Sequence, residues 1–205
     1  MAWRPPYRGA LMELPEISDF RELFLQDRPL LDVRAPVEFA DGAFPSARNL
    51  PLLTDRERHL IGIRYKESGQ ASATDLGREL IDGEPREQRV AHWKRFIEQH
   101  PQGALYCFRG GMRSRITQEW IYAATGVAYP RVKGGYKALR RYLLEELDRS
   151  ITRLQPLVVG GRTGAGKTIL LKQLDHAIDL EGLAWHRGSA FGRHATPQPT
   201  QIDFE

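Results

Sequence analysis

The sequence has little cysteine and no long hydrophobic run. These two absences bear on disulfide bonds and on membrane-spanning segments. Cys107 is the single cysteine in 205 residues, so the chain forms no intrachain disulfide, and the reducing cytoplasm is the default expectation. No apolar run approaches the roughly 18 residues that span a bilayer. The N-terminus also lacks the apolar block of a secretory signal. We therefore expect a cytoplasmic protein with no membrane segment.

The overall composition is ordinary, but the charge is unevenly distributed. Hydrophobic residues make up 41% and charged residues 27%, which is typical of a globular protein with one full core and part of a second. The formal net charge is +4, yet residues 109–153 alone hold ten Lys or Arg against four Asp or Glu. Such a basic stretch suits a polyanion such as RNA, or it forms a solvated helix face. The charge pattern alone does not decide between an RNA-binding surface and a solvated helix face.

Short apolar runs alternate with helical patterns along most of the chain. Residues 29–34 and 103–107 have the pattern of buried strands, and residues 42–50 contain turn residues followed by another strand signal. Thr54 and Glu57 form a capping box that begins a helix. Further helices are expected over 74–99, broken near 82–85, and over 114–124 and 136–154. This alternation predicts an α/β fold with a parallel sheet flanked by helices.

The most distinctive segment for chemistry is the loop that begins at Cys107. A predicted strand delivers this cysteine to its carboxyl end, where open α/β sheets bind ligands. Two glycines allow the following N–H groups to converge at a helix N-terminus, and a cationic site of this kind favours the thiolate. We predict that the anion nest comprises Phe108, Arg109, Gly110, Gly111, Met112 and Arg113.

Two other interpretations of this loop remain. A lone cysteine is often an inert buried residue. Arg113 follows Cys107 by six positions and precedes Ser114, which is the Cys-x5-Arg-Ser pattern of cysteine-dependent phosphatases. Residues 108–112 contain no Asp or Glu to act as a general acid, which weighs against a phosphatase without removing it.

A second glycine-rich loop fits the P-loop pattern Gly-x4-Gly-Lys-Thr. It follows an apolar run at 157–159, predicted to be a strand, and precedes a helical pattern. Backbone N–H groups would wrap a diphosphate, Lys167 would neutralise it, and Thr168 is available to Mg²⁺; ATP is not required. No other metal site is expected. The tail at 186–193 resembles a second anion-binding loop. The predicted P-loop residues are Gly161, Arg162, Thr163, Gly164, Ala165, Gly166, Lys167 and Thr168.

Four ordered segments resemble the rhodanese family. They are Asp32-Val33-Arg34 with Glu38-Phe39, then the turn at 42–51, then Cys107, then Lys133-Gly134-Gly135-Tyr136. The resemblance implies a rhodanese-like domain over 16–144, after an N-terminal extension at 1–15. A linker containing the helix end (145–156) and a partial P-loop domain (157–205) complete the expected organisation.

The combination of both loops resembles the bacterial tRNA 2-selenouridine synthase family. The similar segments are 49–55, 62–66, 106–114, 132–140, 160–168 and 179–184. The resemblance implies that selenium replaces sulfur in wobble 2-thiouridine of tRNA after the sulfur has been geranylated. Cys107 would carry the selenium, the nest would bind selenophosphate, and we interpret the P-loop as the site of geranyl diphosphate. The enzyme supplying selenophosphate is a candidate partner, and a rhodanese-type sulfurtransferase is the alternative activity.

Overall fold

The structure is a computed structural model that describes residues 13–162, 164–187 and 191–204. The chain divides into two compact units. The first comprises the residues up to Ala40 together with Phe44–Tyr142, and the second comprises Asp41–Ala43 and the residues from Leu143 onward. Cys107 therefore lies in the first unit and Lys167 in the second. Within the described ranges, no helix combines the length and apolar content required to span a membrane.

The first unit is built on a parallel sheet of five short strands in the order β1-β5-β4-β2-β3. Leu31 of β2 is paired with Arg48 of β3 on one side and with Leu105 of β4 on the other. The residues of β2 and β4 are fully buried, as expected for central strands of a parallel sheet. The strands are β1 Glu16–Ile17, β2 Leu30–Asp32, β3 Ala47–Asn49, β4 Ala104–Tyr106 and β5 Arg131–Val132. The predicted parallel α/β sheet is confirmed.

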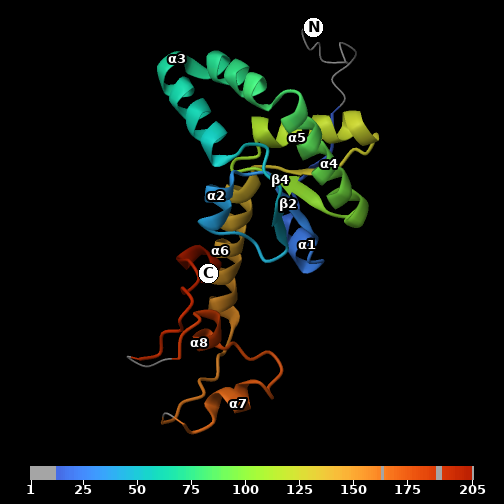
Figure 1. The fold of residues 1–205 in the computed structure, drawn as a ribbon. Helices are drawn as coiled ribbons and strands as arrows, with labels where there is room; N and C mark the ends of the chain where they lie inside the picture. The colour runs from blue at the N-terminus through green and yellow to red at the C-terminus, as the bar shows by residue number, and fades with distance from the viewer. Residues whose placement is uncertain (1–12, 163, 188–190, 205) are drawn as a thin grey trace. The chain divides into compact units, whose positions relative to one another are not determined.

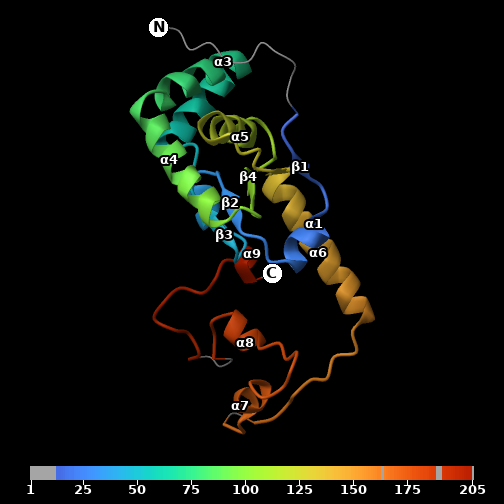
Figure 2. The same ribbon diagram turned by 90° about the vertical axis from the view of Figure 1, so that its right-hand side faces the viewer.

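In the described residues, helices α1 to α6 accompany the sheet, and α6 continues into the second unit. Helices α4 and α5 lie side by side (Figures 1 and 2). Trp93 and Phe96 of α4 and Ile121 of α5 are buried in one cluster with Leu31 and Leu105 of the sheet. This cluster is the hydrophobic core of the first unit. The helices are α1 Phe20–Leu25, α2 Pro36–Ala40, α3 Asp55–Ile81, α4 Glu84–Gln99, α5 Met112–Thr125 and α6 Gly135–Arg153.

Helix α3 begins where the sequence predicts and then runs further than expected. Thr54 and Glu57 form the predicted capping box, in which each side chain accepts a hydrogen bond from the other residue's backbone N–H. At Gly69 the backbone adopts φ +77°, a left-handed conformation that interrupts the helix. Figure 1 shows the resulting two helical arms that meet at a bend. The first arm ends at this bend, and the second ends at Ile81, before the predicted break.

Besides the end of α6, the described residues of the second unit contain three short helices, α7 Lys167–Leu171, α8 Leu180–Leu183 and α9 Gln201–Phe204. The strand predicted at 157–159 is wrong, because these residues have no regular structure and Leu157 is 97% exposed. An apolar run becomes a strand only when neighbouring backbone accepts and donates its hydrogen bonds. The described part of this unit offers no such strand, since its one β-bridge joins His186 to Arg193.

Candidate functional site

Cys107 is the residue that follows β4, a strand inside the sheet with β5 on one side and β2 on the other. Its side chain is only 3% exposed. The thiol donates a hydrogen bond to Ser114 Oγ at 3.3 Å, and Ser114 Oγ donates in turn to the Gly111 carbonyl at 3.0 Å. Burial alone would also suit an inert thiol. The hydroxyl contact and the glycine loop distinguish this cysteine from a purely apolar core residue.

The loop after Cys107 is held by the start of α6. The Tyr136 N–H donates to the Cys107 carbonyl at 2.9 Å, and the Lys137 N–H donates to the Phe108 carbonyl at 3.1 Å. Gly135 has φ +60°, and a Cβ there would lie 2.2 Å from the Cys107 carbonyl oxygen and 2.4 Å from Gly110 N. The Gly-Gly turn that resembles the rhodanese family therefore lies directly against the cysteine loop.

We expect Gly135→Ala to displace this loop and destabilise the protein. The added methyl group meets backbone atoms, which do not yield as a flexible side chain would, and the positive φ adds strain of about 1–3 kcal/mol. The melting temperature should fall by roughly 4–10 °C. Gly62→Ala is the control, because a Cβ added at that exposed helical position would have nothing within 4 Å. Alanine favours the helix more than glycine does, so this variant should melt no lower than wild type. Equal melting temperatures for the two variants would contradict the close packing at Gly135.

Arg113 points its guanidinium at Glu38, a residue of α2. Arg113 Nη1 lies 2.5 Å from Glu38 Oε2, and Nη2 lies 3.1 Å from Oε1. The same carboxylate accepts a hydrogen bond from the Ala35 N–H at 3.0 Å and lies 3.3 Å from Arg58 Nε. The sequence interpretation assigned Arg113 to the anion nest but gave Glu38 no role. Any anion bound beside Cys107 would share Arg113 with this carboxylate.

These contacts set the ionisation of the pair. Burial alone would raise the pKa of Glu38, but the hydrogen bonds and charge of Arg113, with smaller contributions from Ala35 and Arg58, lower that pKa below its usual 4.5. Burial opposes the charged form of Arg113 too, yet Glu38 raises the pKa of Arg113 further above its usual value. Glu38 is therefore a carboxylate at neutral pH and has no proton to donate as a general acid.

The depressed pKa of Glu38 predicts a pH-dependent contribution to stability. Because the folded-state pKa lies below the unfolded value, the contribution is fully present above pH 4.5 and is lost as the pH falls through the folded pKa. Glu38→Gln should lower the free energy of unfolding by about 1.5–3 kcal/mol at pH 7. The difference from wild type should shrink below pH 4.5, as measured by urea denaturation at several pH values.

Glu79→Gln is the matched control, because Glu79 is an exposed carboxylate of α3. It should unfold like wild type at every pH. If the difference in free energy of unfolding between wild type and Glu38→Gln stays constant well below pH 4.5, the contribution of this pair does not depend on the ionisation of Glu38.

The other predicted nest residues differ in exposure. Arg109, Gly111 and Met112 are exposed, whereas Phe108 is half-buried and stacks on the Tyr136 ring with 6.1 Å between centroids. Gly110 has φ +64°, and its carbonyl accepts a hydrogen bond from Arg131 Nη1 at 3.0 Å. The structure thus places all of the predicted nest residues in one connection between β4 and the first turn of α5.

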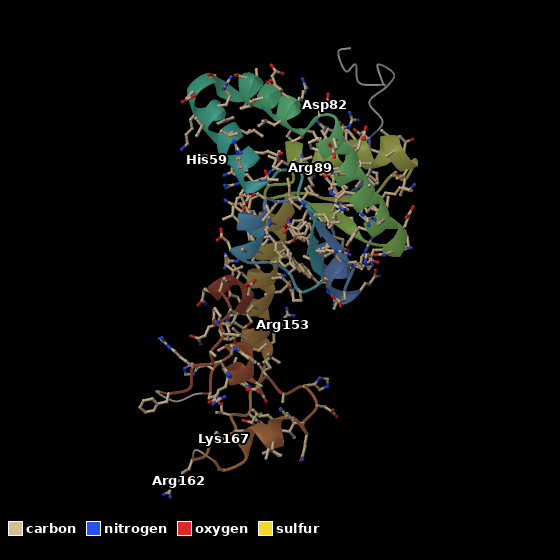
Figure 3. The ribbon with its side chains drawn as sticks, in the orientation of Figure 1. His59, Asp82, Arg89, Arg153, Arg162 and Lys167 are labelled. Carbon is tan, nitrogen blue, oxygen red and sulfur yellow. The ribbon has the colours of Figure 1, made fainter. Side chains whose placement is uncertain are left out.

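The P-loop residues surround the start of α7 in the second unit, where Figure 3 labels Arg162 and Lys167. Lys167 Nζ donates to the Gly161 carbonyl at 3.0 Å and to the Arg162 carbonyl at 3.1 Å. Gly164 and Gly166 both have positive φ. The ammonium is therefore folded back over the loop and uses two of its three N–H groups on carbonyls. Thr163 lies outside the described residues, as do residues 188–190 of the predicted second anion loop.

Comparison with known proteins supports the resemblance to tRNA 2-selenouridine synthases. The family model described as the tRNA 2-selenouridine synthase AAA domain matches residues 154–205. Curated tRNA 2-selenouridine synthases from Sulfurovum sp. (strain NBC37-1) and Marinobacter nauticus (strain ATCC 700491 / DSM 11845 / VT8) are 60% and 59% identical over 193 and 191 residues. Over most of its length this chain is therefore similar to curated tRNA 2-selenouridine synthases.

The similarity covers 94% and 93% of this chain but 53% and 52% of those two proteins. The chain spans about half the length of the curated relatives it matches. A solved structure, the N-terminal domain of a protein from Clostridium difficile 630 described as ATP/GTP-binding, is 26% identical and covers 58% of this chain and 90% of its own. Its TM-score of 0.49 is too low to establish a shared fold.

Proposed function

We propose that this chain is part of a tRNA 2-selenouridine synthase, in which selenium carried on Cys107 replaces the sulfur of wobble 2-thiouridine in tRNA. The main support is the position of Cys107 at the carboxyl end of a central parallel strand, followed at once by a glycine loop and a helix N-terminus. The similarity to curated synthases points to the same activity. The basic stretch at 109–153 supplies charge for contacts with tRNA phosphates.

A rhodanese-like domain over 16–144 belongs to this proposal. Its support is that the resembling segments contact one another although they are far apart in the sequence. Arg34 forms a buried ion pair with Asp32 at 2.7 Å, and Asn49 Nδ2 donates to the Arg34 carbonyl at 2.9 Å. The Arg34 guanidinium lies 3.9 Å from the Tyr136 ring centroid, and the Tyr136 N–H bonds the Cys107 carbonyl. These segments therefore act together to position the cysteine loop.

The P-loop at Gly161–Thr168 provides the geranylation site in this proposal. The thiouridine sulfur attacks C1 of geranyl diphosphate, the C1–O bond breaks, and diphosphate leaves. Backbone N–H groups of the loop and Lys167 would bind the leaving diphosphate, with Mg²⁺ on Thr168 supplying further positive charge. No ATP enters this step.

Selenium transfer then requires two bond exchanges. A terminal selenium bound to the Cys107 sulfur attacks C2 of the base, the C2–S bond breaks, and the geranylthiolate leaves. A small thiol attacks the Cys107 sulfur and breaks the S–Se bond, which frees selenouridine and leaves a mixed disulfide for a second thiol to reduce. When selenophosphate loads the cysteine, the S–Se bond forms as the Se–P bond breaks, and its electron pair leaves with phosphorus as phosphite.

The test is a reaction of the full-length protein with 2-thiouridine-containing tRNA, geranyl diphosphate, selenophosphate and a thiol. We expect 2-selenouridine in the digested tRNA by mass spectrometry. Transfer of sulfur from thiosulfate alone would favour the sulfurtransferase alternative, and hydrolysis of an aryl phosphate that depends on Cys107 would favour the phosphatase. Absence of selenouridine under all conditions would reject the proposed function.

A further inference from the structure

A large cavity opens beside the cysteine loop, between the two arms of α3 and the start of α5. Its volume is about 680 Å³, within the roughly 300–1,000 Å³ of small-molecule sites. Apolar side chains form most of its wall. They include Leu53, Ile61, Ala73, Ile81, Ile116 and Trp120.

The cavity reaches the cysteine loop through the first turn of α5. Met112 and Arg113, both predicted nest residues, line it. Thr74 Oγ1 lies 3.7 Å from Met112 Sδ, which joins the second arm of α3 to the loop. Leu53 and Ile81 of the cavity wall belong to the same buried cluster as Cys107. A molecule in the cavity would therefore have its end close to the loop that holds the thiol.

Seven of the seventeen residues that line the cavity are polar or charged. They are Gln70, Thr74, Arg78, Asp82, Arg86, Arg113 and Glu119. Asp82 and Arg78 have exposed side chains, and the Arg86 guanidinium lies 4.5 Å from the Trp120 ring centroid and 3.8 Å from Asp82. Figure 3 labels Asp82 after the second arm of α3. The apolar part of this wall suits a hydrocarbon chain, and the polar residues suit the polar end of the same molecule.

We infer that this cavity binds the geranyl chain of the S-geranylated uridine while the C2–S bond lies at the cysteine loop. The inference rests on the proposed function, in which geranylthio is the leaving group at Cys107. A branched hydrocarbon carried into the first unit must be removed from water, and each buried methylene is worth roughly fourfold in affinity. The apolar wall beside Met112 and Arg113 provides that environment where the C2–S bond breaks.

Gly77→Leu tests the cavity directly. Gly77 lines the cavity from the second arm of α3, and a Cβ there would lie 3.4 Å from Ile61 Cδ1 on the opposite arm, an ordinary contact distance. A leucine side chain would therefore occupy the space between the arms. We expect the affinity of the full-length protein for S-geranyl-2-thiouridine to fall at least about 10-fold by titration calorimetry. Its affinity for 2-thiouridine should not change.

Gly62→Leu is the matched control. It makes the same substitution in the first arm of the same helix, at an exposed position with open space around the Cβ. It should bind S-geranyl-2-thiouridine like wild type. Equal affinities of the Gly62→Leu and folded Gly77→Leu proteins for the geranylated nucleoside would overturn the inference.

Photo-crosslinking of wild type needs no substitution and serves if Gly77→Leu does not fold. A diazirine placed on the geranyl chain of the nucleoside should label peptides of α3 or α5. Labelling confined to residues outside both helices would overturn the inference.

Failure of this inference can be distinguished from failure of the proposed function. If wild type makes 2-selenouridine while either test fails, the proposed function stands and only the assignment of the cavity is wrong. If wild type makes none, the proposed function has failed.

Discussion

Replacing Cys107 with serine should abolish the formation of 2-selenouridine while leaving geranylation of thiolated tRNA measurable. Cys107 is the one thiol in the chain, and a serine hydroxyl of similar size cannot carry selenium through an S–Se bond. Oxygen is smaller than sulfur, so the serine side chain fits the space beside Ser114 Oγ and the fold should survive. We expect selenouridine to fall by at least about 10³-fold, to the detection limit of mass spectrometry on digested tRNA.

Geranylated tRNA is the internal control for this experiment. It should accumulate in the Cys107→Ser reaction, because the P-loop belongs to the other unit. Intact-protein mass provides an independent readout, since a selenium adduct on wild type should be missing from Cys107→Ala. Selenouridine made at the normal rate by Cys107→Ser would remove the carrier role.

Lys167→Ala should weaken binding of geranyl diphosphate by about 10- to 100-fold. A charge-assisted contact to the diphosphate is worth roughly 1.5–3 kcal/mol, which corresponds to this loss. The ammonium already lies over the loop, 3.0 Å and 3.1 Å from two of its carbonyls, and needs only to turn toward a bound anion. The measurement is titration of the full-length protein with geranyl diphosphate and with ATP side by side.

Lys172→Ala is the control, because Lys172 is an exposed lysine at the end of α7. It should bind geranyl diphosphate like wild type, and the selenium adduct on Cys107 should form in both variants. Tight ATP binding without competition from geranyl diphosphate, together with intact geranylation by Lys167→Ala, would identify a nucleotide site instead.

Local features of the first unit follow from the sequence. The apolar runs that become β2 and β4 are short and continuous, and only a buried parallel strand satisfies that pattern in this α/β alternation. The capping box at Thr54 and the glycine at 83 act within one helical turn, so they mark the start of α3 and the break before α4. The cysteine loop is one continuous segment, and its glycines and arginines could be recognised directly.

Contacts between distant residues were decided by the tertiary structure. Glu38 and Arg113 are 75 positions apart, and nothing in either segment indicates that the carboxylate pairs with the nest arginine. The cavity depends on how the two arms of α3 diverge at Gly69 and face α5, which helical periodicity does not encode. The apolar run at 157–159 is a case in which local sequence predicted an element that the structure does not form. Its composition favours a strand, but a strand forms only where another backbone completes its hydrogen bonds.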